Sequence, residues 1–119
     1  MLLKPGGGPS IIPSIAFERE LIGGLTKLML LLKTIKVELP IFLFLTLVGV
    51  EGYSMATGDS FYKGSVSIDR EVISLPEVII ENYEEKAEKI LKPCFDSVWN
   101  ACGFSESRNY DKDDKWTPK

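Results

Sequence analysis

The sequence predicts an α+β fold: an N-terminal amphipathic helix, a small, mostly antiparallel sheet with a buried central strand, and a kinked C-terminal helix. Three observations lead to this prediction. Apolar residues recur every three or four positions between residues 14 and 36. An apolar run fills residues 41–48, and a second helical periodicity, interrupted by Pro93, begins near residue 82.

The chain has 119 residues, of which 45% are hydrophobic and 26% are charged, as is typical of a globular domain. This length is enough to bury a core without a metal or a disulfide. We place one α+β domain at residues 14–104. Residues 1–13 are expected to be a flexible leader, and residues 105–119 a charged tail that is partly ordered at most.

The first predicted helix spans residues 14–36. Its apolar face steps by four, four, three, four and three through Phe17, Leu21, Leu25, Leu28, Leu32 and Ile35. Ser14 is a suitable N-cap. Two consecutive glycines, Gly23 and Gly24, weaken a helix interior, so we interpret them as a place where another backbone approaches closely.

The run at residues 41–48 predicts a strand that is covered on both faces and lies at the centre of the sheet, because it does not alternate with polar residues. Glycines at 49 and 52 then turn the chain, and residues 53–57 predict a returning strand. Within residues 72–80, Pro76 confines the pattern to an edge or a break, because proline cannot donate to a ladder.

The C-terminal helix is predicted to begin near Asn82, with Glu85 completing a capping box. Its apolar face comprises Ala87, Ile90, Leu91, Cys94, Phe95, Val98 and Cys102. Pro93 removes a backbone donor and predicts a kink or two abutting helices. Gly103 fits the C′ position, which lets Phe104 fold back on Val98 or Trp99.

Charge and composition exclude several functions. The first 50 residues hold five basic and three acidic residues, whereas residues 51–119 hold nine basic and fourteen acidic ones. The second part therefore has the wrong sign for a phosphate-binding surface. The chain contains no histidine, which excludes histidine-based acid–base catalysis and histidine metal ligands. We predict no enzymatic activity, no cofactor and no metal.

Two further features bear on the cellular environment. Cys94 and Cys102 lie eight residues apart without a metal-binding pattern, which indicates reduced buried thiols of a cytoplasmic protein. Residues 21–50 are the most apolar stretch and support an alternative hypothesis, a small membrane-associated protein that uses them as a helical hairpin or interfacial segment. Charged residues and Pro40 interrupt this stretch, so it does not predict a spanning helix.

One polar cluster could carry recognition chemistry. Asp96, Trp99 and Asn100 lie at i, i+3 and i+4 and therefore share one side of the C-terminal helix. They could form a recognition face for a nucleotide, a base or a peptide. Alternatively, Asp96 and Asn100 hydrogen-bond to neighbouring loops while Trp99 fills a gap. Tyr110 and Trp116 are expected to pin the tail to the surface.

The segment from Pro93 to Phe104, followed by the residues at 107–111 and 115–116, resembles the closing segment of a prokaryotic protein family. These are the Schlafen-type, AlbA-like DNA-binding proteins, often described as ATP-binding or helix-turn-helix proteins. Further similar stretches lie at residues 17–22 and 40–53, and in two short pieces, Ile68-Asp69-Arg70 and Leu75-Pro76-Glu77-Val78.

In that family, the domain credited with DNA or nucleotide binding lies upstream of the similar region. The resemblance therefore implies that this chain corresponds to the C-terminal module alone. It implies a non-catalytic accessory or interaction module of the cytoplasm, whose partner is a separate upstream AlbA-like domain or a second copy of the chain. We expect no direct nucleic-acid binding by this chain alone, and nucleotide hydrolysis is an enzyme hypothesis that rests only on such relatives.

Overall fold

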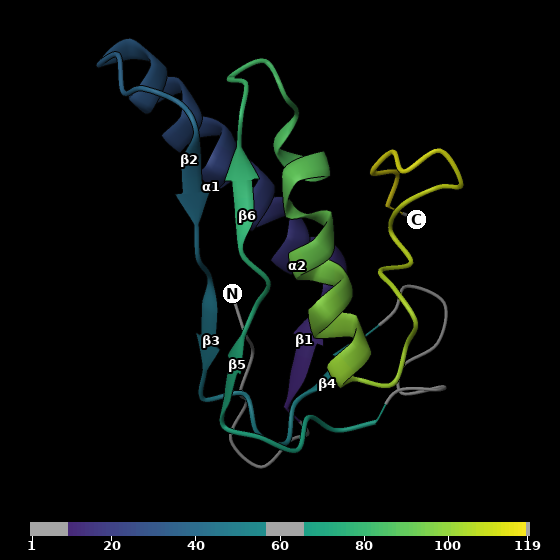
Figure 1. Cartoon of the computed structure of the whole chain (residues 1–119). Helices are drawn as coiled ribbons and strands as arrows, with labels where there is room; N and C mark the ends of the chain where they lie inside the picture. Colours follow the sequence, from purple (N-terminus) through teal and green to yellow (C-terminus); the bar gives the residue numbers. More distant parts are fainter. Residues whose placement is uncertain (1–9, 57–65, 119) are drawn as a thin grey trace.

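The computed structural model describes residues 10–56 and 66–118, which form an α+β structure as predicted (Figure 1). The helices within these ranges are α1 (Ser14–Thr34) and α2 (Ala87–Ala101). The short strands in the same described ranges are β1 (Ile11–Pro13), β2 (Ile41–Leu43), β3 (Thr46–Val48), β4 (Ser54–Ala56), β5 (Val72–Ser74) and β6 (Val78–Ile80). Two of the three strand pairs are antiparallel, and α2 packs against both α1 and β6.

The two antiparallel pairs, β2 with β6 and β3 with β5, follow one another along the chain and form one long ladder, which we call the ribbon (Figure 1). Leu43 pairs with Val78 and Thr46 with Ser74, so the two residues between β2 and β3 face three residues between β5 and β6. Pro76 lies among these three. The break predicted at this proline is confirmed, and the extra residue accommodates the missing backbone donor.

The ribbon corrects the prediction of a strand buried on both faces. Burial alternates along residues 41–48: the odd-numbered side chains are partly buried, whereas Phe42 is 53%, Phe44 68% and Val48 67% exposed. Among the described residues, only one face of the ribbon is covered by other parts of the chain. The lack of alternation in the sequence arises because the outward positions are apolar as well.

A separate pair, β1 with β4, is parallel and joins Ile11 to Ser54 and Pro13 to Ala56. This corrects two predictions. Residues 11–13 are a strand and not part of a leader, and Ile12 is fully buried. The strand that follows the turn at residues 49–52 does not return along residues 41–48, because the positive φ angles of Gly49 and Gly52 redirect it towards β1. Residues 1–9 and Thr57 lie outside the described residues.

Helix α1 uses a different face from the predicted one in its second half. Leu25 and Met29 are buried there, whereas Leu28 is 39% and Ile35 60% exposed. Five consecutive apolar residues at 28–32 give no single face from sequence alone. The glycine prediction is also wrong, because a Cβ added at either glycine would meet nothing within 4 Å.

Helix α2 begins later than predicted. Its N-cap is Lys86, while the Asn82 side chain accepts a hydrogen bond from the Glu84 amide at 2.9 Å and so caps a preceding turn. The helix runs through Pro93, and all seven residues of the predicted apolar face are buried. Gly103 has a φ of +91°, as expected at C′, and amides 103 and 104 bond to the carbonyls of Asn100 and Trp99.

Candidate functional site

The buried carboxylate of Glu18 lies at the centre of the region that the predicted motif occupies. Glu18 belongs to the first turns of α1 and is 0% exposed. Its Oε2 accepts hydrogen bonds from Trp99 Nε1 at 2.7 Å and Ser107 Oγ at 2.8 Å. Its Oε1 accepts from Asn109 Nδ2 at 3.1 Å and Trp116 Nε1 at 2.9 Å. We call these five residues the Glu18 junction.

The Glu18 junction has no free acceptor position for a ligand. A carboxylate offers about four lone-pair sites, and four donors occupy them here. All four donors are neutral, and no ion pair to Glu18 is found among the described residues. Burying a charge without a counter-ion is costly unless hydrogen bonds replace its water. The polar groups of the junction are therefore engaged in holding the closing segment, residues 104–118, against α1 and α2.

A second polar group lies beside the junction on α2. Lys92 Nζ contacts Asp96 Oδ2 at 2.9 Å and Glu106 Oε1 at 3.0 Å, with its side chain 16% exposed. Burial alone would lower the pKa of Lys92, but the hydrogen bonds to these carboxylates raise it above the ordinary value of 10.5. The other oxygen of Asp96 accepts from the Ser107 amide at 2.9 Å. Asp96 therefore joins the closing segment to α2.

The other predicted residues also bind the closing segment. Asn100 donates to the carbonyls of Phe104 and Ser105, both at 2.8 Å, and so closes the end of α2. The Tyr110 hydroxyl donates to the Glu88 carbonyl. Burial, followed by nearby carboxylates, raises the pKa of Tyr110 above its ordinary value of 10.0.

The five predicted residues, Asp96, Trp99, Asn100, Tyr110 and Trp116, thus lie together where α1, α2 and the closing segment meet. Their contacts favour the structural interpretation over a recognition face. Within residues 105–118, these contacts hold Ser107, Asn109, Tyr110 and Trp116 against the helices, with Ser107 2% and Asn109 6% exposed, whereas residues 111–115 are exposed. Sequence reasoning missed Glu18, Ser107 and Asn109. One signal was available for Glu18, an acidic residue directly beside Phe17 on the apolar face of the first helix.

The cysteines offer no reactive site. Both are free and buried, as predicted. Burial raises the pKa of each thiol to about 11, so both are protonated at neutral pH. The Cys94 thiol donates to the Pro76 carbonyl at 3.4 Å. Among the described residues, no group of histidine, cysteine or acidic side chains is arranged to hold a metal ion.

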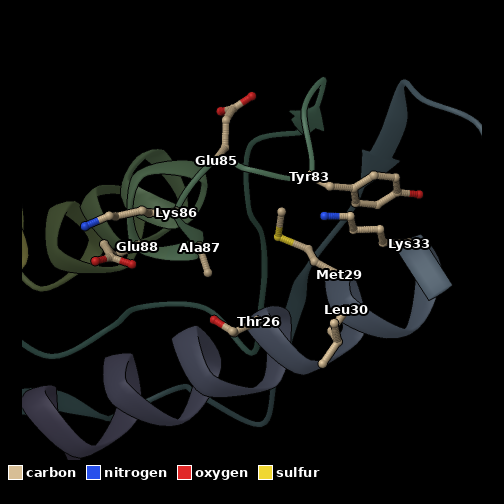
Figure 2. A pocket seen from close by; sticks show the side chains of 9 residues that line it. All are labelled: Thr26, Met29, Leu30, Lys33, Tyr83, Glu85, Lys86, Ala87 and Glu88. Carbon is tan, nitrogen blue, oxygen red and sulfur yellow. The ribbon is translucent and has the colours of Figure 1, made fainter.

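A shallow groove of about 390 Å³ lies between α1 and the start of α2 (Figure 2). Its lining combines apolar side chains such as Met29 and Ala87 with charged ones such as Lys86. Lys33 on its border is already paired with Glu84 at 2.8 Å, and this pairing lowers the pKa of that carboxyl. The volume is at the lower end of the range for small-molecule sites, and its charged side chains are of both signs.

The most distinctive surface is the outward side of the ribbon, which we call the outer face. It presents Phe42, Phe44, Val48, Val72 and Ile79, with Thr46 and Ser74 between them. These five apolar side chains are between 40% and 68% exposed. Phe42 is the cross-strand partner of Ile79, and Val48 of Val72, so each pair lies on the same side. The result is an apolar stripe along the ribbon, beside which the exposed Glu77 lies at the break between β5 and β6.

Comparison with known proteins adds no identification: no family model, curated protein or solved structure matches this chain. The resemblance to AlbA-like proteins therefore stays a prediction. As for the membrane hypothesis, none of the helices among the described residues combines the length and apolar character needed to cross a bilayer. The second arm of the predicted hairpin is not helical, since residues 41–48 hold β2 and β3.

Proposed function

We propose that this chain is a non-catalytic interaction module that docks a protein partner on the outer face of the ribbon. The observation that supports it is the contiguous stripe of Phe42, Phe44, Val48, Val72 and Ile79. Monomeric proteins rarely expose large contiguous apolar patches, and patches of this kind mark interaction sites. The resemblance to the C-terminal module of AlbA-like proteins implies the same function.

The distribution of polar groups supports an interaction module over an enzyme. In the described part of the chain, the buried carboxylate of Glu18 is saturated, both thiols are held protonated, and Lys92 is shared among carboxylates. Acid–base or nucleophilic catalysis needs such a group free beside a cavity. The two buried free thiols also support a reducing compartment, so we propose a cytoplasmic location.

Charge supports a protein partner over a nucleic acid. Glu71, Glu77 and Glu81 are exposed and lie directly before β5, at the break between β5 and β6, and directly after β6. They would repel phosphates, whose binding depends on clustered lysine and arginine. A surface of aromatic and β-branched side chains suits the apolar centre of a protein interface.

Site-specific photo-crosslinking in producing cells tests this proposal. A photoreactive phenylalanine analogue at position 44 should yield a discrete crosslinked species. The same analogue at position 30 provides the control, because Leu30 is 66% exposed, close to the 68% of Phe44, but lies on α1. Equal crosslinking at both positions, or none at position 44, would contradict the proposal.

A further inference from the structure

We infer that the partner binds as an added strand: an extended peptide segment, apolar at alternate positions and basic at its ends, that pairs with one edge of the ribbon. This inference rests on the proposed function and names the form of the partner. The edge is the side of residues 41–48 that faces away from β5 and β6, and we call it the open edge. Figure 1 shows β2 and β3 at one border of the molecule, and neither has a second strand neighbour among the described residues.

The even-numbered residues direct their backbone groups to the open edge. The Leu75 amide donates to the Leu45 carbonyl at 2.9 Å, so the backbone of Leu45 faces the opposite strand of the ribbon. Successive residues of a strand direct their N–H and C=O groups to opposite edges. Burial alternates without interruption along residues 41–48, so this strand keeps its regular alternation past the break between β5 and β6. The outward residues are therefore Phe42, Phe44, Thr46 and Val48.

These outward groups are available for pairing. Outside the ladders themselves, none of the hydrogen bonds found within residues 10–56 and 66–118 involves their N–H or C=O groups. Proteins commonly protect such an edge with lysine, proline or a bulge. Residues 41–48 contain no charged residue and no proline, and the extra residue of the ribbon lies in the opposite strand. The edge is therefore open over its whole length.

The spacing of these groups selects an extended backbone as the occupant. A row of N–H and C=O groups at alternate residues is matched by another strand, whose own groups repeat at the same interval. A helix cannot match it, because its backbone groups are bonded within the helix. On the outer face, the side chains of the added strand would lie beside Phe42, Phe44 and Val48, so apolar residues fit there.

Acidic residues at both ends of the open edge select basic residues at the ends of the added strand. Glu38 precedes Ile41 by three residues, Glu51 follows Val48 by three, and both are exposed. The opposite strand adds one exposed glutamate at each end. These are Glu81, next to the partner of Ile41, and Glu71, next to the partner of Val48.

Nearby basic residues do not cancel this charge. Arg70 is paired with Asp69 at 3.4 Å, and the basic residue nearest to the edge in sequence, Lys36, precedes Ile41 by five residues. A second copy paired antiparallel along this edge would bring the end with Glu38 beside the end with Glu51, so like charges would meet. A separate segment with lysine or arginine at its ends is favoured instead.

Amide hydrogen exchange of the full chain, followed by NMR, tests the edge with a defined probe. The probe is a synthetic peptide of about nine residues, alternating valine and threonine with a lysine at each end. In the free chain, the amides of Phe44 and Thr46 should exchange at least about 10-fold faster than that of Leu47, and the probe should slow them at least about 10-fold. The same peptide with glutamate at each end should bind at least about 5-fold more weakly.

Unchanged exchange at Phe44 and Thr46 with the probe at millimolar concentration would overturn the added strand. Equal binding of the lysine and glutamate peptides would overturn the assignment of basic ends.

Substitutions at Thr46 test the backbone contact in the protein. Thr46→Pro removes one outward N–H and leaves the ladder with β5 intact, so it should weaken binding of the probe by about 10-fold or more. Thr46→Val is the matched control, because it changes the side chain but keeps the N–H. Circular dichroism checks that both variants keep the wild-type spectrum. Equal binding by the two variants would contradict strand addition.

The crosslinking experiment separates this inference from the proposed function. Thr46→Pro should abolish the crosslinked species at position 44, whereas Thr46→Val should retain it. If the species persists in Thr46→Pro, strand addition is wrong and docking on the outer face remains. If the crosslinked partner is a second copy of the chain, the separate segment is wrong. If position 44 crosslinks nothing in the wild type, both proposals fail.

Discussion

The Glu18 junction and the outer face of the ribbon are opposite in character. At the junction, every oxygen lone pair of a buried carboxylate is used, and aromatic rings such as Trp99 and Phe104 pack at 5.1 Å between centroids. On the outer face, large apolar side chains lie in register and are covered by nothing in the described structure. The polar and aromatic residues of the junction thus find their partners within the fold, whereas the apolar residues of the outer face remain exposed.

This difference shows where function can reside in such a molecule. A buried carboxylate stabilises the fold only if it is fully hydrogen-bonded, so the residues around it have no capacity left for a ligand. Exposed apolar side chains have the opposite property, because their hydration is relieved only when something covers them. The comparison therefore assigns a role in folding to the junction, and it leaves the outer face as the surface that we propose for interaction.

The largest expected effect follows from breaking the junction. Glu18→Ala would leave four donors without an acceptor in the interior, and should lower the free energy of unfolding by about 5 kcal/mol. Glu18→Gln keeps one acceptor oxygen but turns an NH₂ group towards two donors, so we expect a loss of about 2–3 kcal/mol. Chemical denaturation followed by tryptophan fluorescence measures both losses.

Glu20→Gln is the matched control for this test. Glu20 lies on the same helix, two residues away, and is exposed. Its substitution should change the free energy of unfolding by less than about 0.5 kcal/mol. If Glu18→Gln is no more destabilising than Glu20→Gln, the junction does not hold the closing segment.

The second effect is a loss of stability at alkaline pH. Burial raises the pKa of Cys94 and Cys102 from 9.0 to about 11. The pKa of Tyr110 is also raised by burial, and that of Lys92 by its hydrogen bonds to carboxylates. Above pH 9 the unfolded chain releases these protons while the folded chain retains them. The stabilisation is therefore complete below pH 9 and is lost as the pH rises towards 11.

The expected size of this loss is about 4 kcal/mol between pH 9 and pH 11 from the two thiols, and Tyr110 and Lys92 add to it from about pH 10 upwards. Thermal unfolding across this range measures it. In the Cys94→Ala/Cys102→Ala variant, the slope between pH 9 and 10 should be shallower, although the variant is less stable at every pH. A wild-type unfolding temperature that is constant from pH 8 to 11 would show that the thiols are not buried.

Part of this comparison could be predicted from the sequence, and part could not. The buried face of α2, the break at Pro76 and the C′ role of Gly103 follow from local periodicity and from single residues with restricted or unusual backbone freedom. The junction does not, because Glu18 is separated from Trp99 by 81 residues and from Trp116 by 98. Periodicity within one element carries no information about partners at that distance.

The outer face escaped prediction for a different reason. An apolar residue at every position from 41 to 48, apart from Thr46, fits a strand covered on both sides and equally fits one whose second side awaits a partner. The same ambiguity affects α1, where five successive apolar residues hide the fact that Met29 is buried and Leu28 exposed. Apolar composition predicts that a surface will be covered, but not by which chain.

The smallest effect concerns the glycine pair in α1, between the packed and the exposed parts of that helix. Gly24 is exposed, and a Cβ added there would meet nothing within 4 Å. Gly24→Ala should therefore raise the free energy of unfolding by about 0.5–1 kcal/mol, through helix propensity and a less flexible unfolded chain. Gly103→Ala is the control of opposite sign, because its φ of +91° strains any residue with a Cβ. If Gly24→Ala instead destabilises the chain, the site is not open and another backbone approaches this helix.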